Sequence, residues 1–143
     1  MRKIIILLCA LCFAVKGMCQ PHHGFSVKQV EPTFKNIDYA GDGLEGHLMD
    51  IYLPSDVKGK HKVIIAIYGS AWFANNMKSA AFFSIGKPLI DSGFAVVCIN
   101  HRSSGDAKFP AQIHDVKAAI RYLRANAGKY GLDTSFIGIT GFS

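Results

Sequence analysis

Two uninterrupted runs of apolar residues, VIIAIY at 63–68 and FAVVCI at 94–99, constrain the fold of this chain more than any other feature. A strand that is apolar at every position must be covered on both faces, which is typical of parallel strands in α/β proteins. A third, shorter segment of the same kind, FIGIT, lies at 136–140. We therefore predict a parallel sheet that is packed between helices.

The segments between these strands have helical patterns. Apolar residues recur every three or four positions at 113, 116, 120 and 123, which predicts a helix that begins at Pro110 and ends at Gly128. Residues 78–92 are helical in composition, although Gly86 and Pro88 should kink or break this helix. Strand, helix, strand, helix and strand form a βαβαβ unit with right-handed crossovers.

Two further strand candidates, 34–39 and 47–53, precede this unit and are separated by the turn-forming sequence GDG at 41–43. Alternating side chains in the second candidate predict a half-exposed strand, which Pro54 ends. We predict that the two strands form an antiparallel hairpin at the edge of the sheet.

Residues 1–19 have the parts of a secretory signal peptide. Arg2 and Lys3 form a positive start, and residues 4–15 are an apolar run of twelve, too short to span a bilayer. Gly17 and Cys19 are small residues in the right places for cleavage before Gln20. We expect a secreted or periplasmic protein with no membrane span after cleavage, then a leader at 20–33 and a partial domain at 34–143.

Two other interpretations of this N-terminal segment remain open. A lipoprotein attached through Cys19 is less favoured, because Lys16-Gly17-Met18 is a poor match to the sequence that directs lipid attachment. A short membrane anchor or a buried helix is the remaining alternative.

Removal of the signal changes both the charge and the cysteine count. The formal charge of the chain falls from +6 to +3, an ordinary value for solubility, so composition does not support a nucleic-acid partner. Of the four cysteines only Cys98 remains, and its place in an apolar run predicts a buried structural thiol. No histidine or cysteine spacing indicates a metal site, and we expect no cofactor.

The candidate nucleophile follows the third apolar strand, where the chain reads Gly141-Phe142-Ser143. This is the first half of the G-x-S-x-G nucleophile elbow, in which small neighbours allow a serine to occupy a sharp turn after a strand. The serine hydroxyl then stands clear of the sheet, where a histidine can deprotonate it. The three residues alone are a weak signal, and Ser143 could instead cap a following helix.

The candidate oxyanion loop, Tyr68-Gly69-Ser70-Ala71-Trp72, follows the first apolar strand, where serine hydrolases of the α/β type carry an HGGG-type loop. The N–H groups of Ser70 and Ala71 are predicted to face a developing oxyanion, and such donors contribute about 3 kcal/mol each to transition-state stabilisation. An ordinary strand-to-helix turn is the alternative.

The residues that could line a pocket beside this loop are Tyr68, Trp72, His101 and Arg102. The last two follow the second apolar strand, on the ligand-binding side of such a sheet. For both, a structural pairing is the favoured alternative. Asp115 is expected to make a structural salt bridge or a cap, near Arg102 or near the strand ends. Trp72 and Phe73 are expected to shape the pocket wall.

Together these segments resemble the N-terminal half of an α/β-hydrolase esterase of the BD-FAE-like carboxylesterase group, which includes feruloyl and acetyl-xylan esterase relatives. The matching segments are MDIYLP at 49–54, the loop at 68–72 and the stretch at 109–143, so the resemblance covers most of 36–143. It implies the N-terminal part of an α/β-hydrolase fold, a mostly parallel sheet with an antiparallel edge hairpin, truncated at the nucleophile elbow.

The same resemblance implies that Ser143 is the nucleophile, that Ser70 and Ala71 supply oxyanion amides, and that the substrate is a small-molecule or polysaccharide-linked ester. The family usually has His-Gly-Gly at 68–70, where this chain has Tyr-Gly-Ser. In α/β hydrolases the triad Asp and His follow the serine. We therefore expect a serine carboxylesterase present as an incomplete fragment, inactive by itself.

Three other functions remain open at this point. A serine peptidase or a lipase would use the same fold. A nucleotide-binding loop opening at 138–141 has little support, because such loops normally follow the first strand of a domain. A non-catalytic remnant or binding protein is the third alternative, since fold and function are separable.

Overall fold

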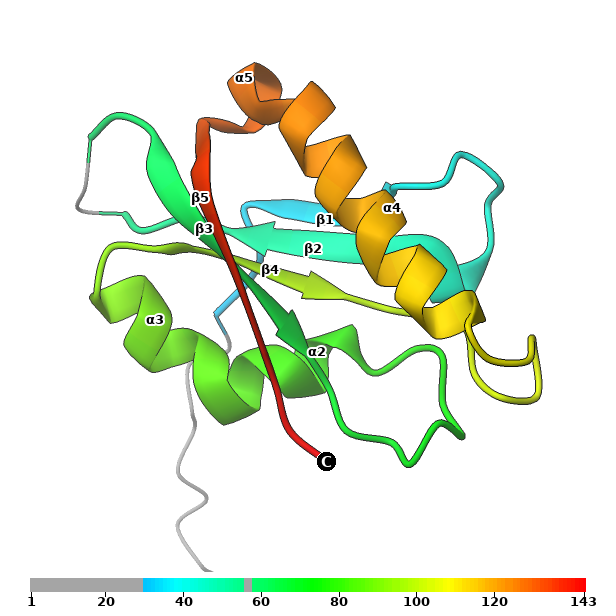
Figure 1. Cartoon of the computed structure of the whole chain (residues 1–143). Coiled ribbons are helices and arrows are strands. Elements are labelled where there is room, and N and C mark those ends of the chain that lie inside the picture. Colours follow the sequence, from blue (N-terminus) through cyan, green and yellow to red (C-terminus); the bar gives the residue numbers. More distant parts are fainter. Residues whose placement is uncertain (1–29, 56–57) are drawn as a thin grey trace, which may run out of the picture. The chain divides into compact units, whose positions relative to one another are not determined.

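The computed structural model describes residues 30–55 and 58–143, which form a five-stranded sheet of order β1-β2-β4-β3-β5 (Figure 1). Strands β3, β4 and β5 are parallel, and β1 and β2 add an antiparallel hairpin beside β4. The strands are β1 (Phe34–Asp38), β2 (Leu48–Tyr52), β3 (His61–Ile67), β4 (Ala95–Ile99) and β5 (Leu132–Gly141). The predicted parallel sheet with an edge hairpin is therefore confirmed.

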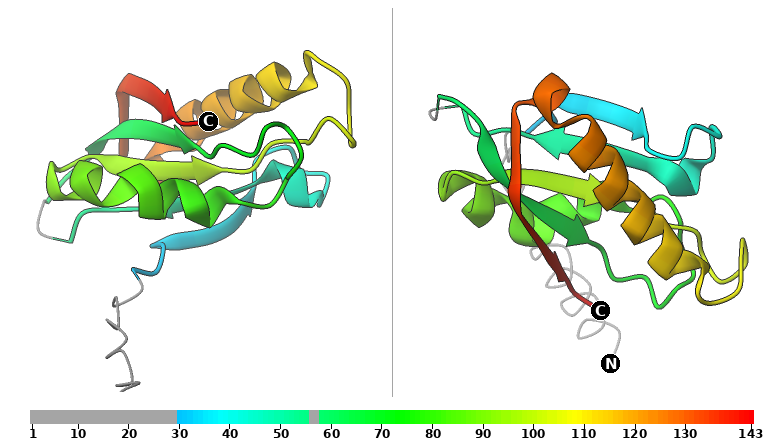
Figure 2. Two further views of the ribbon diagram at one scale, coloured as in Figure 1. Left: turned by 90° about the horizontal axis from the view of Figure 1, so that it is seen from below. Right: turned by 45° about the horizontal axis from the view of Figure 1, so that its top comes forward.

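Helices cover both faces of this sheet. The long helix α4 lies on one face, and the segment α2-η2-α3 lies on the other (Figures 1 and 2). The chain contains η1 (Glu45–His47), α2 (Lys78–Ala81), the π-helical turn η2 (Phe82–Gly86), α3 (Lys87–Asp91), α4 (Ala111–Ala125) and α5 (Ala127–Tyr130). No helix in the described part of the chain is long and apolar enough to cross a membrane.

Successive side chains of the central strands enter two separate cores, as an all-apolar strand requires. Ile65 of β3 packs in the core beneath α4, with Leu123 of that helix. Ala66, the next residue, packs in the core beneath α2 and η2, with Phe82. Cys98 is fully buried in the second core, as predicted, and this burial raises the pKa of its thiol well above the ordinary range.

Strand β2 is not half-exposed, and that prediction is wrong. Four of its five residues are buried, because both faces of the sheet are covered at this strand. Met49 lies in the core beneath α4, Tyr52 lies in the core beneath α2 and η2, and Asp50 is buried as well. Lys78 compensates the buried carboxylate, with Nζ 3.5 Å from Asp50 Oδ2. The other oxygen, Oδ1, accepts the N–H of Asn36, 2.7 Å away, where a positive φ of 53° interrupts the register of β1. A buried carboxylate thus holds a bulge in the edge strand.

The predicted end of the long helix at Gly128 is also wrong. Helix α4 ends at Ala125, and Asn126 donates its side-chain amide to the carbonyl of Tyr122 at 2.9 Å. Gly128 lies inside the short helix α5, which ends at Gly131 in a left-handed conformation with φ of 65°. Glycine is favoured at that position because it has no Cβ.

Candidate active site

The candidate site lies where β3 and β5 end and where the chain leaves β4, at the carboxyl edge of the parallel strands. This edge is where open α/β sheets bind ligands. A cavity of about 170 Å³ opens there, with the candidate oxyanion loop on one side and the candidate nucleophile on the other. Its lining residues are Ile67, Tyr68, Gly69, Ser70, Ala71, Trp72, His101, Phe142 and Ser143.

The loop after β3 lies directly against the loop after β5. A Cβ on Gly69 would sit 2.6 Å from the carbonyl oxygen of Phe142 and 2.8 Å from Cα of Ser143, distances that no side chain can occupy. A Cβ on Gly141 would be 3.3 Å from the carbonyl oxygen of Ile67. The sequence therefore needs glycine at 69, although its neighbours at 68 and 70 differ from the usual family residues.

The oxyanion loop contains a tight turn from Ser70 to Phe73. The N–H of Phe73 donates to the carbonyl of Ser70 at 2.9 Å, and the two central residues, Ala71 and Trp72, have φ of 46° and 68°. Two positive φ values at these positions are the pattern of a type I′ turn, which usually holds Gly, Asn or Asp. The left-handed conformation costs a residue with a Cβ about 1–2 kcal/mol.

The backbone N–H groups of Ser70 and Ala71 are both available to a ligand. Within residues 30–55 and 58–143, neither group donates a hydrogen bond, although both residues line the cavity. Unpaired N–H groups are uncommon where the backbone is held in place. Here the turn is anchored, because Ser104 donates its N–H to the carbonyl of Trp72 at 2.8 Å.

Tyr68 and His101 form one wall of the cavity. The Tyr68 hydroxyl donates to the carbonyl of Ala74 at 3.1 Å, and its ring stacks on the His101 ring with the centroids 4.8 Å apart. Burial raises the pKa of Tyr68, so the phenol stays neutral. The His101 Nδ1 lies 3.0 Å from the carbonyl oxygen of Arg102, and because a carbonyl oxygen can only accept, this nitrogen is the donor.

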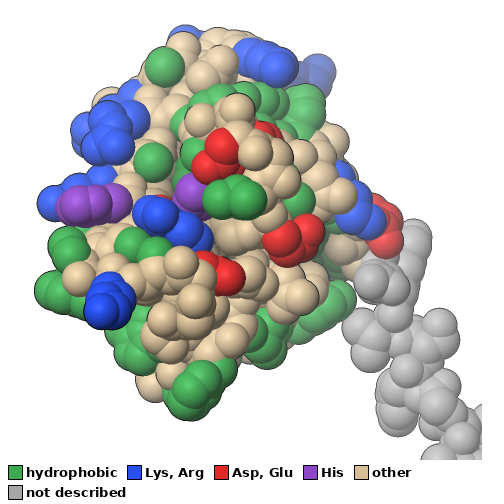
Figure 3. Space-filling view, turned by 90° about the vertical axis from the view of Figure 1, so that its right-hand side faces the viewer, with side chains coloured by type: hydrophobic (Ala, Val, Ile, Leu, Met, Phe, Trp, Pro, Cys, Tyr) green, Lys and Arg blue, Asp and Glu red, His purple; other side chains and the backbone are tan. Residues whose placement is uncertain are grey.

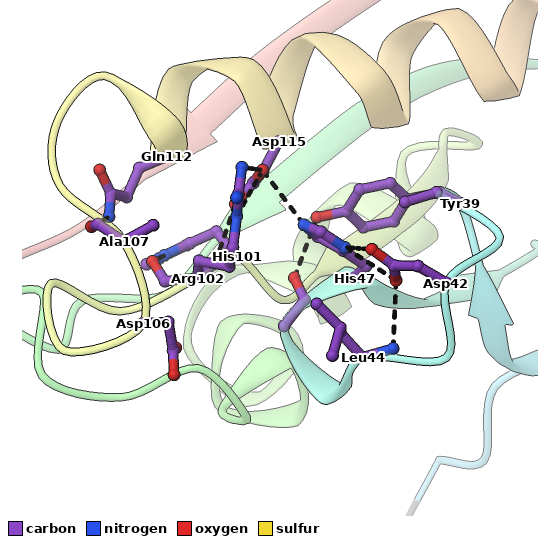
Figure 4. A network of polar contacts seen from close by, with 12 residues as sticks. Tyr39, Asp42, Leu44, His47, His101, Arg102, Asp106, Ala107, Gln112 and Asp115 are labelled. Carbon is purple, nitrogen blue, oxygen red and sulfur yellow. Dashed lines mark hydrogen bonds and ion pairs between the residues drawn. The ribbon is translucent and has the colours of Figure 1, made fainter.

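Arg102 does not line the cavity, which corrects its prediction as a pocket residue. Its side chain turns to Asp115 of α4, with Nη2 2.6 Å from Oδ1 and Nε 3.1 Å from each oxygen (Figure 4). The Arg102 N–H donates to Asp115 Oδ2 at 3.0 Å. The predicted structural pairing of these two residues is thus confirmed, while His101 takes the pocket position.

The Arg102–Asp115 pair belongs to a larger polar network, and sequence reasoning missed its other members (Figure 4). His47 bridges two carboxylates, with Nε2 3.2 Å from Asp115 and Nδ1 2.8 Å from Asp42. Asp115 is only 2% exposed, and this burial raises the pKa of its carboxyl. The hydrogen bonds and the charge of Arg102 lower the pKa by more than burial raises it, so the pKa lies below its ordinary value. The network joins the loop before β2 to the loop after β4 and to α4.

The loop after β4 is fixed by a second set of polar contacts. Asp106 accepts the N–H and the hydroxyl of Ser103, both at 2.8 Å, and these contacts lower the pKa of its carboxyl. Asn75 donates to the same carboxylate at 2.8 Å, which ties this loop to the segment after the oxyanion turn.

The structure brings some of the predicted site residues together in one cavity and leaves others outside it. Ser143, Ser70 and Ala71 line one cavity, and Tyr68 and Trp72 line it with them. Phe73 was expected in the pocket wall, but it is 83% exposed and does not line the cavity that holds Ser143. No Asp or Glu lines the Ser143 cavity, and the described residues contain no group of His, Cys, Asp and Glu suited to a metal ion.

The sheet order, the elbow strand and the loop geometry define an α/β-hydrolase fold of the esterase type, and comparisons with known proteins agree. Residues 49–143 match the sequence profile of BD-FAE. The chain belongs to the BD-FAE family, as the resemblance implied.

Two solved structures are similar over most of the chain. A bifunctional GH43-CE protein of Bacteroides eggerthii is 72% identical, with a TM-score of 0.76 over 77% of this chain and 16% of that one. A truncated carbohydrate esterase from gut microbiota is 62% identical, with a TM-score of 0.76 over 80% of this chain and 41% of that one. Among curated proteins, the esterase LipQ of Mycobacterium tuberculosis (strain ATCC 25618 / H37Rv) is 33% identical over 125 residues. This chain spans 28% of the length of LipQ, while the match takes in 86% of this chain.

Proposed function

We propose that this chain carries the nucleophile and the oxyanion loop of a carboxylesterase that hydrolyses esters of carbohydrates. One observation carries the proposal. Ser143 shares a small cavity with two unpaired backbone N–H groups, those of Ser70 and Ala71, on a loop in contact with the nucleophile turn. This is the arrangement that acyl transfer through a serine requires. The similarity to carbohydrate esterases at 72% and 62% identity supports the sugar ester as substrate.

In the proposed reaction, Oγ of Ser143 attacks the ester carbonyl carbon while a general base takes the hydroxyl proton. The carbonyl oxygen becomes an anion, which the N–H groups of Ser70 and Ala71 stabilise. The carbon–oxygen bond to the alcohol then breaks, the base returns its proton to the leaving alkoxide, and an acyl-serine remains. Water attacks this ester by the same route and releases the acid.

The general base and its carboxylate partner are proposed to come from sequence C-terminal to Ser143, in the order Ser, Asp or Glu, His. The chain covers 28% of LipQ, which supports further sequence in the complete protein. His101 has a different role in this proposal. Its ring is stacked on Tyr68, and its protonated Nδ1 is held by a backbone carbonyl, so it shapes the cavity wall.

We also propose that the protein is exported, to the periplasm or out of the cell. The support is the signal-like sequence of residues 1–19, which lie outside the described residues. Mass spectrometry of the exported protein tests this, since cleavage after Cys19 would leave Gln20 as the first residue. A lipid-modified Cys19 at the terminus would instead identify a lipoprotein.

The activity is tested by the Ser143→Ala variant of the full-length protein, with acetate release from an acetylated sugar as the measurement. We expect a loss of at least about 10³-fold in kcat, because the nucleophile is removed while the fold is kept. A fluorophosphonate probe should modify the wild-type protein at Ser143 and leave the variant unmodified. Equal activity of variant and wild type, with circular dichroism showing both folded, would contradict the proposal.

A further inference from the structure

A second cavity lies beside the nucleophile cavity and shares a wall with it. This cavity has a volume of about 320 Å³ and is lined by Ala71, Trp72, Ser104, Phe109 and Gln112. Ala71 and Trp72 line both cavities, so a molecule that reaches Ser143 can extend into the second one without leaving the surface. The mechanism proposed above uses none of its other lining residues.

Two aromatic side chains of the second cavity are unusually exposed. Trp72 is 56% exposed and Phe109 is 79% exposed, although burial of rings of this size is strongly favourable. Trp72 is moreover held in a left-handed backbone conformation, with φ of 68°. Exposed aromatic surface next to a catalytic cavity, held in place by a strained turn, is typical of a ligand-binding surface. Apolar side chains alternate with charged ones on the side of the molecule shown in Figure 3.

The same cavity has a fixed polar group. Gln112 is 5% exposed, and its side-chain amide donates to the carbonyls of Ser103 at 3.2 Å and Ala107 at 3.0 Å. Both amide hydrogens are therefore used, and no residue in the described ranges donates to its oxygen Oε1. Ser104 lines the cavity as well, and its hydroxyl makes no hydrogen bond within those ranges. The cavity thus offers a held acceptor and a free hydroxyl beside two aromatic rings.

We propose that this second cavity binds the sugar of the ester, which is the alcohol that leaves, and this inference rests on the proposed esterase function. A pyranose has apolar C–H faces and a rim of hydroxyl groups. The faces match the rings of Trp72 and Phe109, and the rim matches Gln112 and Ser104. An aliphatic chain would cover the amide oxygen of Gln112 without pairing it, which is unfavourable.

The sizes of the two cavities indicate which half of the substrate, the acyl group or the alcohol, each cavity binds. The cavity that holds Ser143 is the smaller, at about 170 Å³ against about 320 Å³, and suits a short acyl group such as acetyl. The larger cavity has the polar groups and the exposed rings, and it suits the alcohol. Trp72 and Phe109 are thus assigned as determinants of specificity for the leaving sugar.

The test compares two esters with the same acyl group, a methyl O-acetyl-β-xyloside and ethyl acetate, in the full-length protein. We expect Trp72→Ala and Phe109→Ala each to lower kcat/KM for the sugar ester by about 10- to 100-fold, through loss of ring contact. For Phe109→Ala, whose ring lines the second cavity and not the cavity of Ser143, the value for ethyl acetate should change by less than about 3-fold, because its alcohol does not reach this ring. Phe109→Tyr, which keeps an aromatic ring, should restore most of the sugar-ester activity.

Phe73→Ala is the matched control, since Phe73 is an exposed aromatic residue next to Trp72 that lines neither cavity. It should change neither value. Equal losses on both esters in the Phe109→Ala variant would overturn the inference while leaving the esterase function intact. A loss that depends on acyl length, seen with butyrate esters against acetate esters, would assign the cavity to the acid and also overturn it. Failure of the wild-type protein to hydrolyse either ester would contradict the proposed function itself, and the inference with it.

Discussion

Gly69 and Ser143 lie so close together that a β-carbon on Gly69 would be 2.8 Å from Cα of Ser143. Gly69 belongs to the loop after β3 and Ser143 to the loop after β5, two strands that pair in parallel, without interruption from Val63 to Ile67 of β3. The contact fixes the distance between Ser143, the proposed nucleophile, and the N–H groups of Ser70 and Ala71, the two residues after Gly69. Substitution at this glycine should therefore affect the geometry of catalysis directly.

Gly69→Ala is predicted to reduce both activity and stability. The added methyl group must displace backbone atoms of Phe142 and Ser143, and overpacking of this kind costs about 1–3 kcal/mol. Because the displaced atoms belong to the nucleophile turn, we expect kcat to fall by at least about 10²-fold. Urea denaturation and acetate release measure the two effects.

The control for this substitution is Gly128→Ala in helix α5. Nothing lies within 4 Å of a Cβ at Gly128, and alanine favours a helix over glycine by up to about 1 kcal/mol. This variant should be at least as stable as the wild type, with unchanged kcat. Full activity of Gly69→Ala would show that the two loops are not held as the structure has them.

The strained turn of the oxyanion loop leads to a second prediction. Ala71 has φ of 46°, so Ala71→Gly should relieve strain and raise the free energy of unfolding by about 0.5–1 kcal/mol, after the larger entropy of the unfolded glycine is subtracted. The same change at Ala125, an exposed residue at the end of α4, should lower stability by about 1 kcal/mol. Thermal or urea unfolding measures the stability change at both positions. Changes of opposite sign would support the left-handed conformation of Ala71, and equal destabilisation at the two positions would contradict it.

The sequence predicted the sheet well because residues 63–67 of β3 and all residues of β4 are apolar, and this pattern has few structural solutions. Ser143 was predicted from the G-x-S sequence at 141–143, and Ser70 from its place in the loop after the first apolar strand. The structure places both residues in one cavity.

The sequence could not predict polar contacts between distant segments. His47 contacts Asp115 across 68 positions of the chain, and no local pattern encodes such a pair. The exposure of β2 was misjudged for the same reason, since alternation in the sequence does not reveal Lys78 above the buried Asp50. The aromatic second cavity was missed because Phe109 looks like an ordinary loop residue until the fold brings it beside Trp72.

Cys98 allows a test of the buried core beneath α2. Burial raises the pKa of its thiol far above the ordinary value of about 8.5, so the thiolate is absent from the folded protein near neutral pH. In a variant with serine at positions 9, 12 and 19, we expect no reaction with Ellman's reagent at pH 8 and one equivalent in 8 M urea. Rapid reaction of the folded variant would show that the core is open.

The raised pKa of Cys98 also predicts how the stability of the protein changes at alkaline pH. Because the folded pKa of Cys98 lies above the unfolded one, its contribution to stability is complete below about pH 8.5 and decreases as the pH rises further. Cys98→Ala should flatten this part of the stability curve, at the expense of a small cavity.

The ion pair of Asp115 and Arg102 gives the opposite dependence at acidic pH. Arg102 holds the pKa of the Asp115 carboxyl below its ordinary value of 3.8, so the pair contributes its full stability above about pH 4. The contribution is lost as the pH falls through the lower, folded pKa. Asp115→Asn removes the carboxylate and leaves Arg102 without its partner, which should cost about 2–4 kcal/mol at pH 7.

Thermal unfolding of the wild type and Asp115→Asn between pH 7 and pH 3 measures this dependence. The two curves should approach each other as the pH falls, since the wild type loses the interaction that the variant already lacks. Arg102→Lys should keep only part of the stability that the ion pair contributes to the wild type at pH 7, because a lysine cannot reproduce the Nε and Nη2 contacts with one carboxylate. Parallel curves across this pH range would mean that the carboxyl of Asp115 titrates normally, and that the His47–Asp115–Arg102 network does not hold the loop after β4.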